Sequence, residues 1–242
     1  IRDLSQGVIR TPLEPDTTYS DDPLRMLRAI RFAAKLSTAE RQFRIVPESM
    51  DSMRRMAERL NILSKERIAD ELCKMLVCEH PSIAFRLMDE AGLMHFILPE
   101  LEALKGVETV DGRGHKDNFE HTLSVVDNIH KADVAPQEGR DHLLWLRWAA
   151  LLHDIGKPAT HKLNDKGEST FKNHAAVGGE IAERVLKDLR FSNKVCETVT
   201  FLVSHHDMDV PSTRAEVKRY LNMMGEENFV RLMKIRTADL GE

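Results

Sequence analysis

The stretch that most constrains this chain runs from Trp145 to Pro158 and reads WLRWAALLHDIGKP. Its apolar residues surround a helix, which is typical of a buried helix. We expect this helix to end at Gly156, a natural C-cap. His153 and Asp154 stand side by side in its last turn, where burial is costly unless a partner such as a divalent cation compensates it. The alternative is an ordinary helix end, with His153 favoured by the helix dipole and Asp154 exposed.

Other histidines and one acid share this placement near predicted helix termini or on apolar helix faces. Because packed helices bring such termini into one layer, the candidate metal ligands are His121, His153, Asp154, His174, His206 and Asp239. Ligands of nitrogen and oxygen without thiolate are typical of a catalytic metal site. Six candidates suffice for one or two ions with open water positions, as in phosphoester hydrolysis. Asp154 and Lys157 are the candidate catalytic residues, with Lys157 placed to stabilise charge on a phosphate.

The remaining histidines test whether this pattern is accidental. His205 neighbours His206 but lies off its apolar stripe, so it ranks second as a ligand. Six others occupy polar or linker surroundings, and we predict them to be surface residues: His80, His95, His115, His130, His142 and His161.

The composition predicts an all-α fold. Aromatic residues are few, at 5%, and good helix formers are plentiful. We expect residues 1–19 to be extended, 96–101 to be an apolar link, 106–118 to be a polar segment at a domain boundary, and 159–172 to be a loop or short hairpin. The expected helices span 20–36, 46–60, 64–76, 81–91, 119–131, 142–155, 174–189, 193–206, 213–224 and 227–239. Amphipathic helices of this length need partners, which predicts a bundle.

Charge and cysteine content limit the classes of function. The three cysteines form no CxxC pair, which favours a reduced, cytoplasmic protein, and no apolar run approaches the roughly 18 residues of a membrane span. The net charge of −4 excludes bulk attraction to nucleic acid, so RNA binding would need a local basic stripe. The chain begins with Ile1 instead of Met, and we expect a fragment of a longer protein.

A basic stripe is present on the helix predicted after Pro23. Arg25, Arg28 and Arg31 recur every three residues. This pattern is compatible with a solvated charged face. It is equally compatible with recognition of phosphates or base edges, for which a guanidinium fork is well suited.

Both halves of the chain resemble known families. His121, His153-Asp154 and Asp239, with the form H-D-I-G-K, resemble the HD superfamily of metal-dependent phosphohydrolases, and His174 and His206 resemble its two-metal members. The segments DDPLRMLRAIRFAA and LSKERIADEL resemble those that follow the catalytic head in class II tRNA CCA-adding enzymes and bacterial poly(A) polymerases. The resemblance covers nearly the whole chain.

The resemblance to the nucleotidyltransferases implies roles for particular residues. In that family an acid-Asp-x-x-Arg motif reads the edge of the incoming CTP or ATP, and Asp22 and Arg25 match it, with Asp21 in place of the usual Glu. Glu66 and Arg67 match a motif that braces this region. Arg28 and Arg31 are the candidate RNA-binding residues.

The resemblance also implies a division of the chain. Residues 1–20 would be the end of the nucleotidyltransferase head and a linker, 21–108 a helical neck and body, and 109–242 an HD domain. The paired metal-binding carboxylates of the head and its Arg-Arg-Asp segment are absent, so we expect no nucleotidyl transfer by this chain itself. The segment 39–45 departs from the family pattern.

Three functions follow as alternatives. The first is a fragment of a CCA-adding enzyme or poly(A) polymerase that selects nucleotides, binds tRNA or another RNA 3′ end, and hydrolyses phosphoesters such as 2′,3′-cyclic phosphates. It implies Mn, Ni, Fe, Zn or Mg in the HD site, Mg with ATP or CTP in the head, and no membrane. The second is a helical RNA-binding module with a vestigial, structural HD site. The third, a free-standing nucleotide phosphohydrolase, leaves the helix of Asp22 and Arg25 unexplained.

Overall fold

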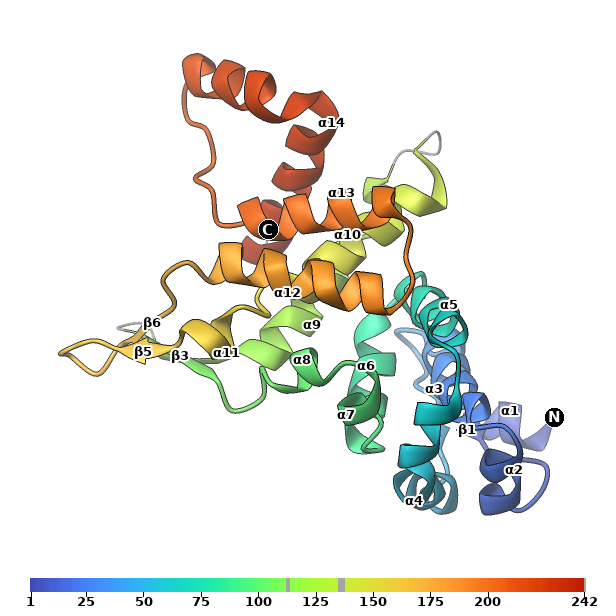
Figure 1. Cartoon of the computed structure of the whole chain (residues 1–242). Coiled ribbons are helices and arrows are strands. Elements are labelled where there is room, and N and C mark those ends of the chain that lie inside the picture. Colours follow the sequence, from blue (N-terminus) through green and yellow to red (C-terminus); the bar gives the residue numbers. More distant parts are fainter. Residues whose placement is uncertain (112–113, 135–137, 242) are drawn as a thin grey trace. The chain divides into compact units, whose positions relative to one another are not determined.

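The fold was analysed in a computed structural model that describes residues 1–111, 114–134 and 138–241. The chain divides into two compact units, unit 1 (Ile1–Glu102) and unit 2 (Ala103–Glu242). Helices dominate both units and the described strands are short, which confirms the all-α prediction (Figure 1). Among the described residues, no helix combines the length and apolar character needed to cross a bilayer.

Unit 1 is a bundle whose central element is α3 (Leu24–Leu36). Met26, Leu27, Ile30 and Ala33 lie on its buried face with no exposed surface, at the spacing that places them on one side of a helix. The other elements of unit 1 are α1 (Arg2–Gln6), β1 (Val8–Ile9), α2 (Pro15–Asp21), β2 (Arg44–Ile45), α4 (Pro47–Met56), the 3-10 helix η1 (Ala57–Ile62), α5 (Lys65–Leu76), α6 (Pro81–Glu90), α7 (Met94–Ile97) and α8 (Pro99–Glu102).

The extended structure predicted for residues 1–19 is wrong. Most of the segment forms α1 and α2, and Asp21 ends α2 instead of starting the next helix. The Glu14 side chain caps α2 by accepting a hydrogen bond from the Thr17 amide at 2.8 Å, and Pro15 occupies the first turn. The apolar link at 96–101 is likewise helical. Strands β1 and β2 pair in parallel, which connects the segment 39–45 to the start of the chain.

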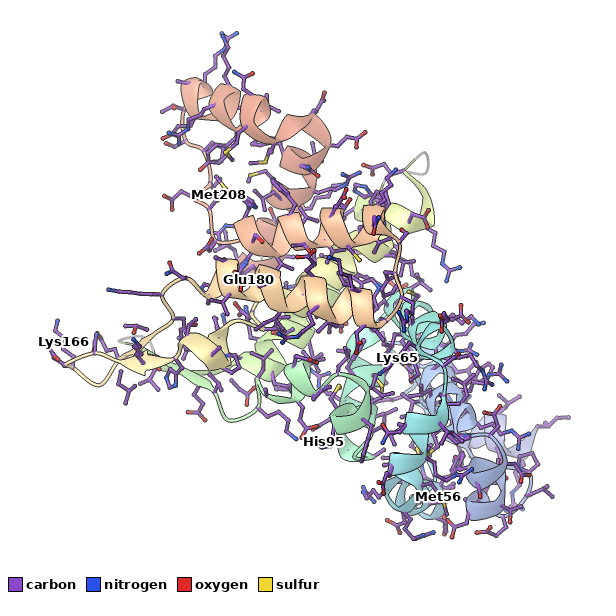
Figure 2. All side chains as sticks on the ribbon, in the orientation of Figure 1. Met56, Lys65, His95, Lys166, Glu180 and Met208 are labelled. Atoms are coloured by element: carbon purple, nitrogen blue, oxygen red, sulfur yellow. The ribbon has the colours of Figure 1, made fainter. Side chains whose placement is uncertain are left out.

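Unit 2 is organised around α10 (Gly139–Leu152), which packs against α9 (Asn118–Asn128), α13 (Asn193–His205) and α14 (Arg214–Leu240). Side chains fill the space between these helices (Figure 2), and Leu146 and Leu151 have no exposed surface. Its other elements are β3 (Glu108–Asp111), β4 (Gly114–Asp117), the 3-10 helix η2 (Lys131–Asp133), α11 (Lys157–Thr160), β5 (Lys162–Leu163), β6 (Ser169–Thr170) and α12 (His174–Asp188).

Two antiparallel hairpins stand beside the helices of unit 2. The β5–β6 hairpin confirms one of the two predicted possibilities for 159–172, whereas the β3–β4 hairpin was not predicted. The last two predicted helices form the single element α14, with a break at Gly225, where φ is 78° and ψ is 163°. Only glycine adopts this backbone conformation without strain, and it falls between the two predicted helices.

Gly156 is needed for close packing, not for a C-cap. Its φ of −77° is an ordinary value, and α10 already ends at Leu152. A Cβ atom at Gly156 would lie 2.1 Å from the carbonyl oxygen of His174 and 2.6 Å from the amide nitrogen of Gly178. The turn after α10 therefore touches the backbone of α12, and a side chain would separate them.

This contact predicts a large effect of one methyl group. Gly156→Ala should destabilise unit 2 by about 3 kcal/mol, because the neighbouring atoms belong to the backbone and must move. Gly178→Ala in the same interface should cost less, since its Cβ would lie 3.3 Å from the amide nitrogen of Gly156, well beyond the 2.1 Å approach at Gly156, and alanine favours the helix. Urea unfolding of both variants measures the difference, and equal losses of stability would contradict the close approach at Gly156.

Candidate metal centre

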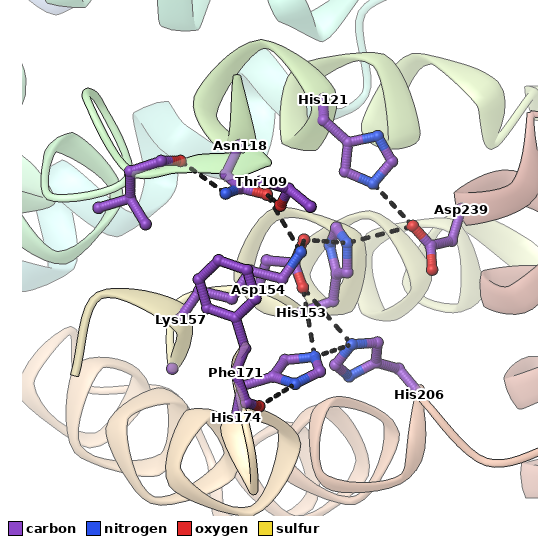
Figure 3. A network of polar contacts seen from close by, with 12 residues as sticks. Thr109, Asn118, His121, His153, Asp154, Lys157, Phe171, His174, His206 and Asp239 are labelled. Carbon is purple, nitrogen blue, oxygen red and sulfur yellow. Dashed lines mark hydrogen bonds and ion pairs between the residues drawn. The ribbon is translucent and has the colours of Figure 1, made fainter. Parts of the chain in front are cut away.

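Ends of five helical segments bring the six predicted ligands together in unit 2 (Figure 3). They come from α9, the turn after α10, the start of α12, the residue after α13 and the last turn of α14. These are, in the same order, His121, His153 with Asp154, His174, His206 and Asp239. Residues separated by more than a hundred positions thus share one small volume.

The ligand atoms form two groups that share one carboxylate. In the first, atoms of His121, His153 and Asp154 lie within 4.8 Å of one another. In the second, the same holds for Asp154, His174 and His206. Oδ1 of Asp239 adds to the first group, at 2.7 Å from Nε2 of His121 and 3.5 Å from Nε2 of His153. The geometry therefore offers two adjacent positions for a cation, bridged by Asp154.

Backbone carbonyl groups orient three of the imidazoles. Nδ1 of His153 lies 2.6 Å from the oxygen of Ala150, and Nδ1 of His206 lies 2.7 Å from that of Val203. Nδ1 of His174 lies 3.0 Å from the oxygen of Phe171. Because a carbonyl only accepts, each Nδ1 carries a proton and each Nε2 faces the cluster, where it offers a lone pair whenever the ring is neutral. This arrangement is common around metal-binding histidines.

The facing nitrogens need a positive charge between them. Nε2 of His174 and Nε2 of His206 are 3.1 Å apart, so two neutral rings would direct lone pairs at each other. Nε2 of His153 is buried and has no hydrogen-bond partner within the described chain. His153, Asp154 and His206 are each exposed by 2% or less. This donor set fits a divalent cation bound through imidazole and carboxylate.

The electrostatics of the cluster separate its histidines into two kinds. Burial disfavours the imidazolium of His153, but the charges of Asp154 and Asp239, whose carboxylate oxygens lie 3.2 Å and 3.5 Å from Nε2, outweigh burial and raise its pKa to about 10. Burial lowers the pKa of His121 and of His174, against a smaller opposing effect of the carboxylates. The rings of His121 and His174 are therefore neutral near pH 7, as metal ligation requires.

The two carboxylates stay ionised. Burial opposes their charge, but His153 outweighs it and holds the pKa of Asp154 well below its usual value, with further contributions from His206 and Lys157. The hydrogen bond with His121 and the nearby His153 likewise lower the pKa of Asp239 despite burial. Two anions in a buried cluster are a strong site for a cation.

Lys157 lies beside Asp154, and its role in stabilising charge on a phosphate stays a prediction. Its ammonium does not point to open solvent, since the side chain is only 11% exposed, and Nζ lies 2.8 Å from Oδ2 of Asp154. It also donates to Oδ1 of Asn118 at 3.1 Å. Asn118 is fully buried, and the sequence analysis missed it. The available signal was its position at the start of α9, directly after the N-cap Asp117.

Most of the other histidines lie outside the buried cluster, in agreement with the prediction that they are surface residues. His95, His130 and His161 are exposed, His80 is half-buried, and the side chain of His115 lies outside the described part of the chain. His142 was predicted to be on the surface, and this was wrong: it is 5% exposed and accepts a hydrogen bond from Nε of Arg231. The helix begins at Gly139, three residues before the predicted start, so His142 lies within α10 and contacts α14 through Arg231.

In unit 1 the residues matched to nucleotide recognition lie around the start of α3. Oδ2 of Asp22 pairs with Arg67 at 3.1 Å, the bracing contact expected for that arginine. Arg25 is exposed and donates to the carbonyl of Thr18 at 3.2 Å. Asp22 and Arg25 are thus held close together: the amide of Arg25 donates to the carbonyl of Asp22 at 3.0 Å, while their side chains contact Arg67 and Thr18 instead of each other.

The other two arginines of the stripe form a buried ion-pair cluster. Nε of Arg31 lies 2.6 Å and Nε of Arg28 lies 3.4 Å from the carboxylate of Glu71, which is 1% exposed. Arg31 is itself 13% exposed, so its contacts are mainly structural, whereas half of the Arg28 side chain remains accessible. RNA binding by these two arginines stays a prediction.

Comparisons with known proteins agree with both halves of this description. Residues 42–105 match the family described as "Probable RNA and SrmB- binding site of polymerase A", and residues 118–236 match the HD domain. The chain is 34% identical over 223 residues to a CC-adding tRNA nucleotidyltransferase of Thermus thermophilus, covering 86% of this chain and 46% of that protein. It is 32% identical to an A-adding tRNA nucleotidyltransferase of Deinococcus radiodurans, covering 93% and 50% respectively.

Solved structures show the same fold. A Thermotoga maritima CCA-adding enzyme in complex with tRNA aligns with a TM-score of 0.55 at 17% identity, over 99% of this chain and 50% of that chain. A CCA-adding enzyme in complex with CTP aligns with a TM-score of 0.54 at 18% identity, over 98% and 47%. The chain spans about half the length of the relatives it matches.

The chain thus joins a segment of the polymerase A RNA-binding family to an HD domain. This chain belongs to the family of tRNA nucleotidyltransferases, or CCA-adding enzymes, and bacterial poly(A) polymerases. The recognition made from the sequence motifs is thereby confirmed.

The raised pKa of His153 predicts a pH dependence of metal binding. Below pH 10 the metal-free cluster holds a proton on His153, and a metal must displace it to use Nε2. The apparent affinity for Mn²⁺ should therefore rise about tenfold per pH unit between pH 7 and 9. Isothermal titration calorimetry in buffers of different ionisation enthalpy should detect one released proton, and an affinity independent of pH would contradict the assignment.

Proposed function

We propose that unit 2 hydrolyses phosphoesters, with 2′,3′-cyclic phosphates as the first substrates to test, and that unit 1 selects nucleotides and binds tRNA for a nucleotidyltransferase. The observation that carries the hydrolytic part is the pair of ligand groups sharing Asp154. Two adjacent cation positions suit a reaction in which both the attacking and the leaving oxygen need stabilisation.

Different residues of the chain would bind the metal, orient its ligands and supply positive charge at such a site. Four imidazoles and two carboxylates would hold the metal, and donor chemistry favours Mn, Ni, Fe, Zn or Mg. A divalent ion supplies Lewis acidity and makes water a better nucleophile at neutral pH. The backbone contacts of His153, His174 and His206 fix their rings in advance, so binding costs little reorganisation. Lys157 places a positive charge at the rim of the same cluster.

Substitution of the most buried histidine tests the hydrolytic proposal. His153→Ala should lose metal and reduce hydrolysis of 2′,3′-cyclic AMP about 100-fold or more, because it removes a ligand of the first group. His205→Ala is the matched control, since the Nδ1 atom of His205 contacts the carbonyl of Phe201 at 2.8 Å and its ring stacks on Phe201. Metal analysis and turnover are measured after chelation and readdition. Full metal content in His153→Ala would refute the ligand assignment.

The competing function is a helical RNA-binding module whose HD cluster is only structural. The same chelation experiment separates the two functions. Retained tRNA binding without phosphatase or diesterase turnover in Mn²⁺, Ni²⁺ or Mg²⁺ would favour the binding module.

Nucleotide selection is proposed for Asp22 and Arg25. A carboxylate accepts from an exocyclic amine and a guanidinium donates to ring acceptors, so the pair can read the edge of CTP or ATP. The contact of Asp22 with Arg67 holds the carboxylate in place. Nucleotidyl transfer itself would need the carboxylates of a catalytic head, with Mg²⁺.

Loss of Arg25 should weaken nucleotide binding. Arg25→Ala is expected to reduce the affinity for ATP and CTP about tenfold. One forked contact to a base edge contributes about 1–3 kcal/mol to the free energy of binding, which corresponds to about tenfold or more in affinity. Arg54→Ala serves as the control, since Arg54 is an exposed arginine of the same unit paired with Asp51. Anisotropy of fluorescent nucleotides measures both. Equal effects of the two variants would contradict base reading by Arg25.

A further inference from the structure

The two oxygens of the shared carboxylate face different neighbours. Oδ1 of Asp154 lies 3.5 Å from Nε2 of His174 and 3.6 Å from Nε2 of His206. Oδ2 lies 3.2 Å from Nε2 of His153 and 2.8 Å from Nζ of Lys157. The ammonium of Lys157 therefore occupies the edge of Asp154 that belongs to the His121–His153 group.

The contact between Lys157 and Asp154 is an ion pair without hydrogen-bond alignment. Oδ2 of Asp154 is buried and has no hydrogen bond from the described residues, although Nζ lies 2.8 Å away. The positive charge of Lys157 thus stabilises this oxygen electrostatically, while the lone pairs of the oxygen accept no hydrogen bond from the described residues. An ammonium at this position substitutes for part of the charge that a cation would supply.

A buried amide holds Lys157 in this position. Oδ1 of Asn118 accepts from Nζ of Lys157 at 3.1 Å and from Oγ1 of Thr109 at 3.2 Å, while Nδ2 donates to the carbonyl of Val107 at 2.6 Å (Figure 3). The contact with Val107 fixes which end of the amide is the donor, because a carbonyl only accepts. Oδ1 therefore has to face Lys157.

The side chain of Lys157 has little other freedom. Its Nζ lies 5.2 Å from the centre of the Phe171 ring, and only 11% of the side chain is exposed. A lysine normally loses considerable rotamer entropy when it forms an ion pair. Here Asn118 and Phe171 restrict the chain beforehand, which strengthens its pairing with Asp154.

We propose that Asn118 is a positioning residue that holds Lys157 as a countercation on Asp154 and so sets the metal affinity of the His121–His153 group. The proposal rests on the proposed function in taking this cluster as a metal site. Lys157 stabilises the metal-free carboxylate and repels a cation at the same edge, and both effects lower affinity. Asn118 acts through Lys157, because its Oδ1 contacts Lys157 and none of the predicted ligands.

The test is a double-mutant cycle read by binding of Mn²⁺ alone. Lys157→Met, Asn118→Ala and the double variant are titrated by calorimetry after chelation, and thermal unfolding of each is followed with and without Mn²⁺. Lys166→Met is the matched loss of one charge, since Lys166 lies exposed at the tip of the β5–β6 hairpin in the same unit (Figure 2). Thr109→Val provides a milder change if Asn118→Ala does not fold.

Loss of the countercation should tighten metal binding. Lys157→Met is expected to bind the tightest Mn²⁺ ion about tenfold more strongly than the parent, because a charge next to the cation is removed. Its melting temperature should fall without metal and recover with Mn²⁺. Asn118→Ala, or Thr109→Val, should give a smaller gain in affinity that disappears in the Lys157→Met background, and Lys166→Met should change neither quantity.

Several results would overturn the proposal. Weaker or unchanged Mn²⁺ binding by Lys157→Met would show that Lys157 is not a countercation. An equal effect of Asn118→Ala in both backgrounds would show that Asn118 acts independently of Lys157. If the parent binds no Mn²⁺, the proposed function fails. The double-mutant cycle measured by thermal unfolding without metal then decides whether Asn118 positions Lys157. Additive losses of stability from Lys157→Met and Asn118→Ala would exclude that role.

Discussion

The buried carboxylate of Asp154 is the feature on which unit 2 depends. It is 2% exposed, and an ionised carboxylate at that depth is unstable unless positive or polar groups surround it. The ends of α10, α12 and α13 meet around it, and the imidazoles that they carry direct their Nε2 atoms inward. Helix packing and ligand geometry therefore satisfy the same requirement, and the turn at Gly156 makes the approach of α12 possible.

Unit 1 also contains a buried carboxylate, but a different kind of side chain compensates its charge. Glu71 is as deeply buried as Asp154, but its partners are the guanidinium groups of Arg28 and Arg31. Arginine always carries its charge and offers only donors, so this cluster is complete within the protein. Around Asp154, Nε2 of His174 and Nε2 of His206 face each other at 3.1 Å, and with each Nδ1 protonated only a shared proton or a cation satisfies both. The chemistry of the partners thus distinguishes a structural ion-pair cluster from a site prepared for a cation.

Residues outside the His153-Asp154 motif also influence the cluster through their contacts with Lys157. Lys157 follows the His-Asp pair in sequence, but its orientation depends on Asn118 and Thr109, which come from the start of α9 and from strand β3. Strand β3 is therefore connected to the centre of the cluster through Thr109. This link gives a physical reason for a short strand pair to stand in a domain that is otherwise helical.

The sequence by itself determined the helical class, most helix limits and the residues that form the candidate metal site. These properties depend on local signals, such as the N-caps Ser64 and Thr213 and the apolar spacing of α3. Only the tertiary structure decided what depends on distant partners: the burial of His142, the close contact at Gly156, the sharing of Asp154 and the position of Lys157. Local propensity does not specify which side chains meet across a core, because packing of remote segments sets those distances.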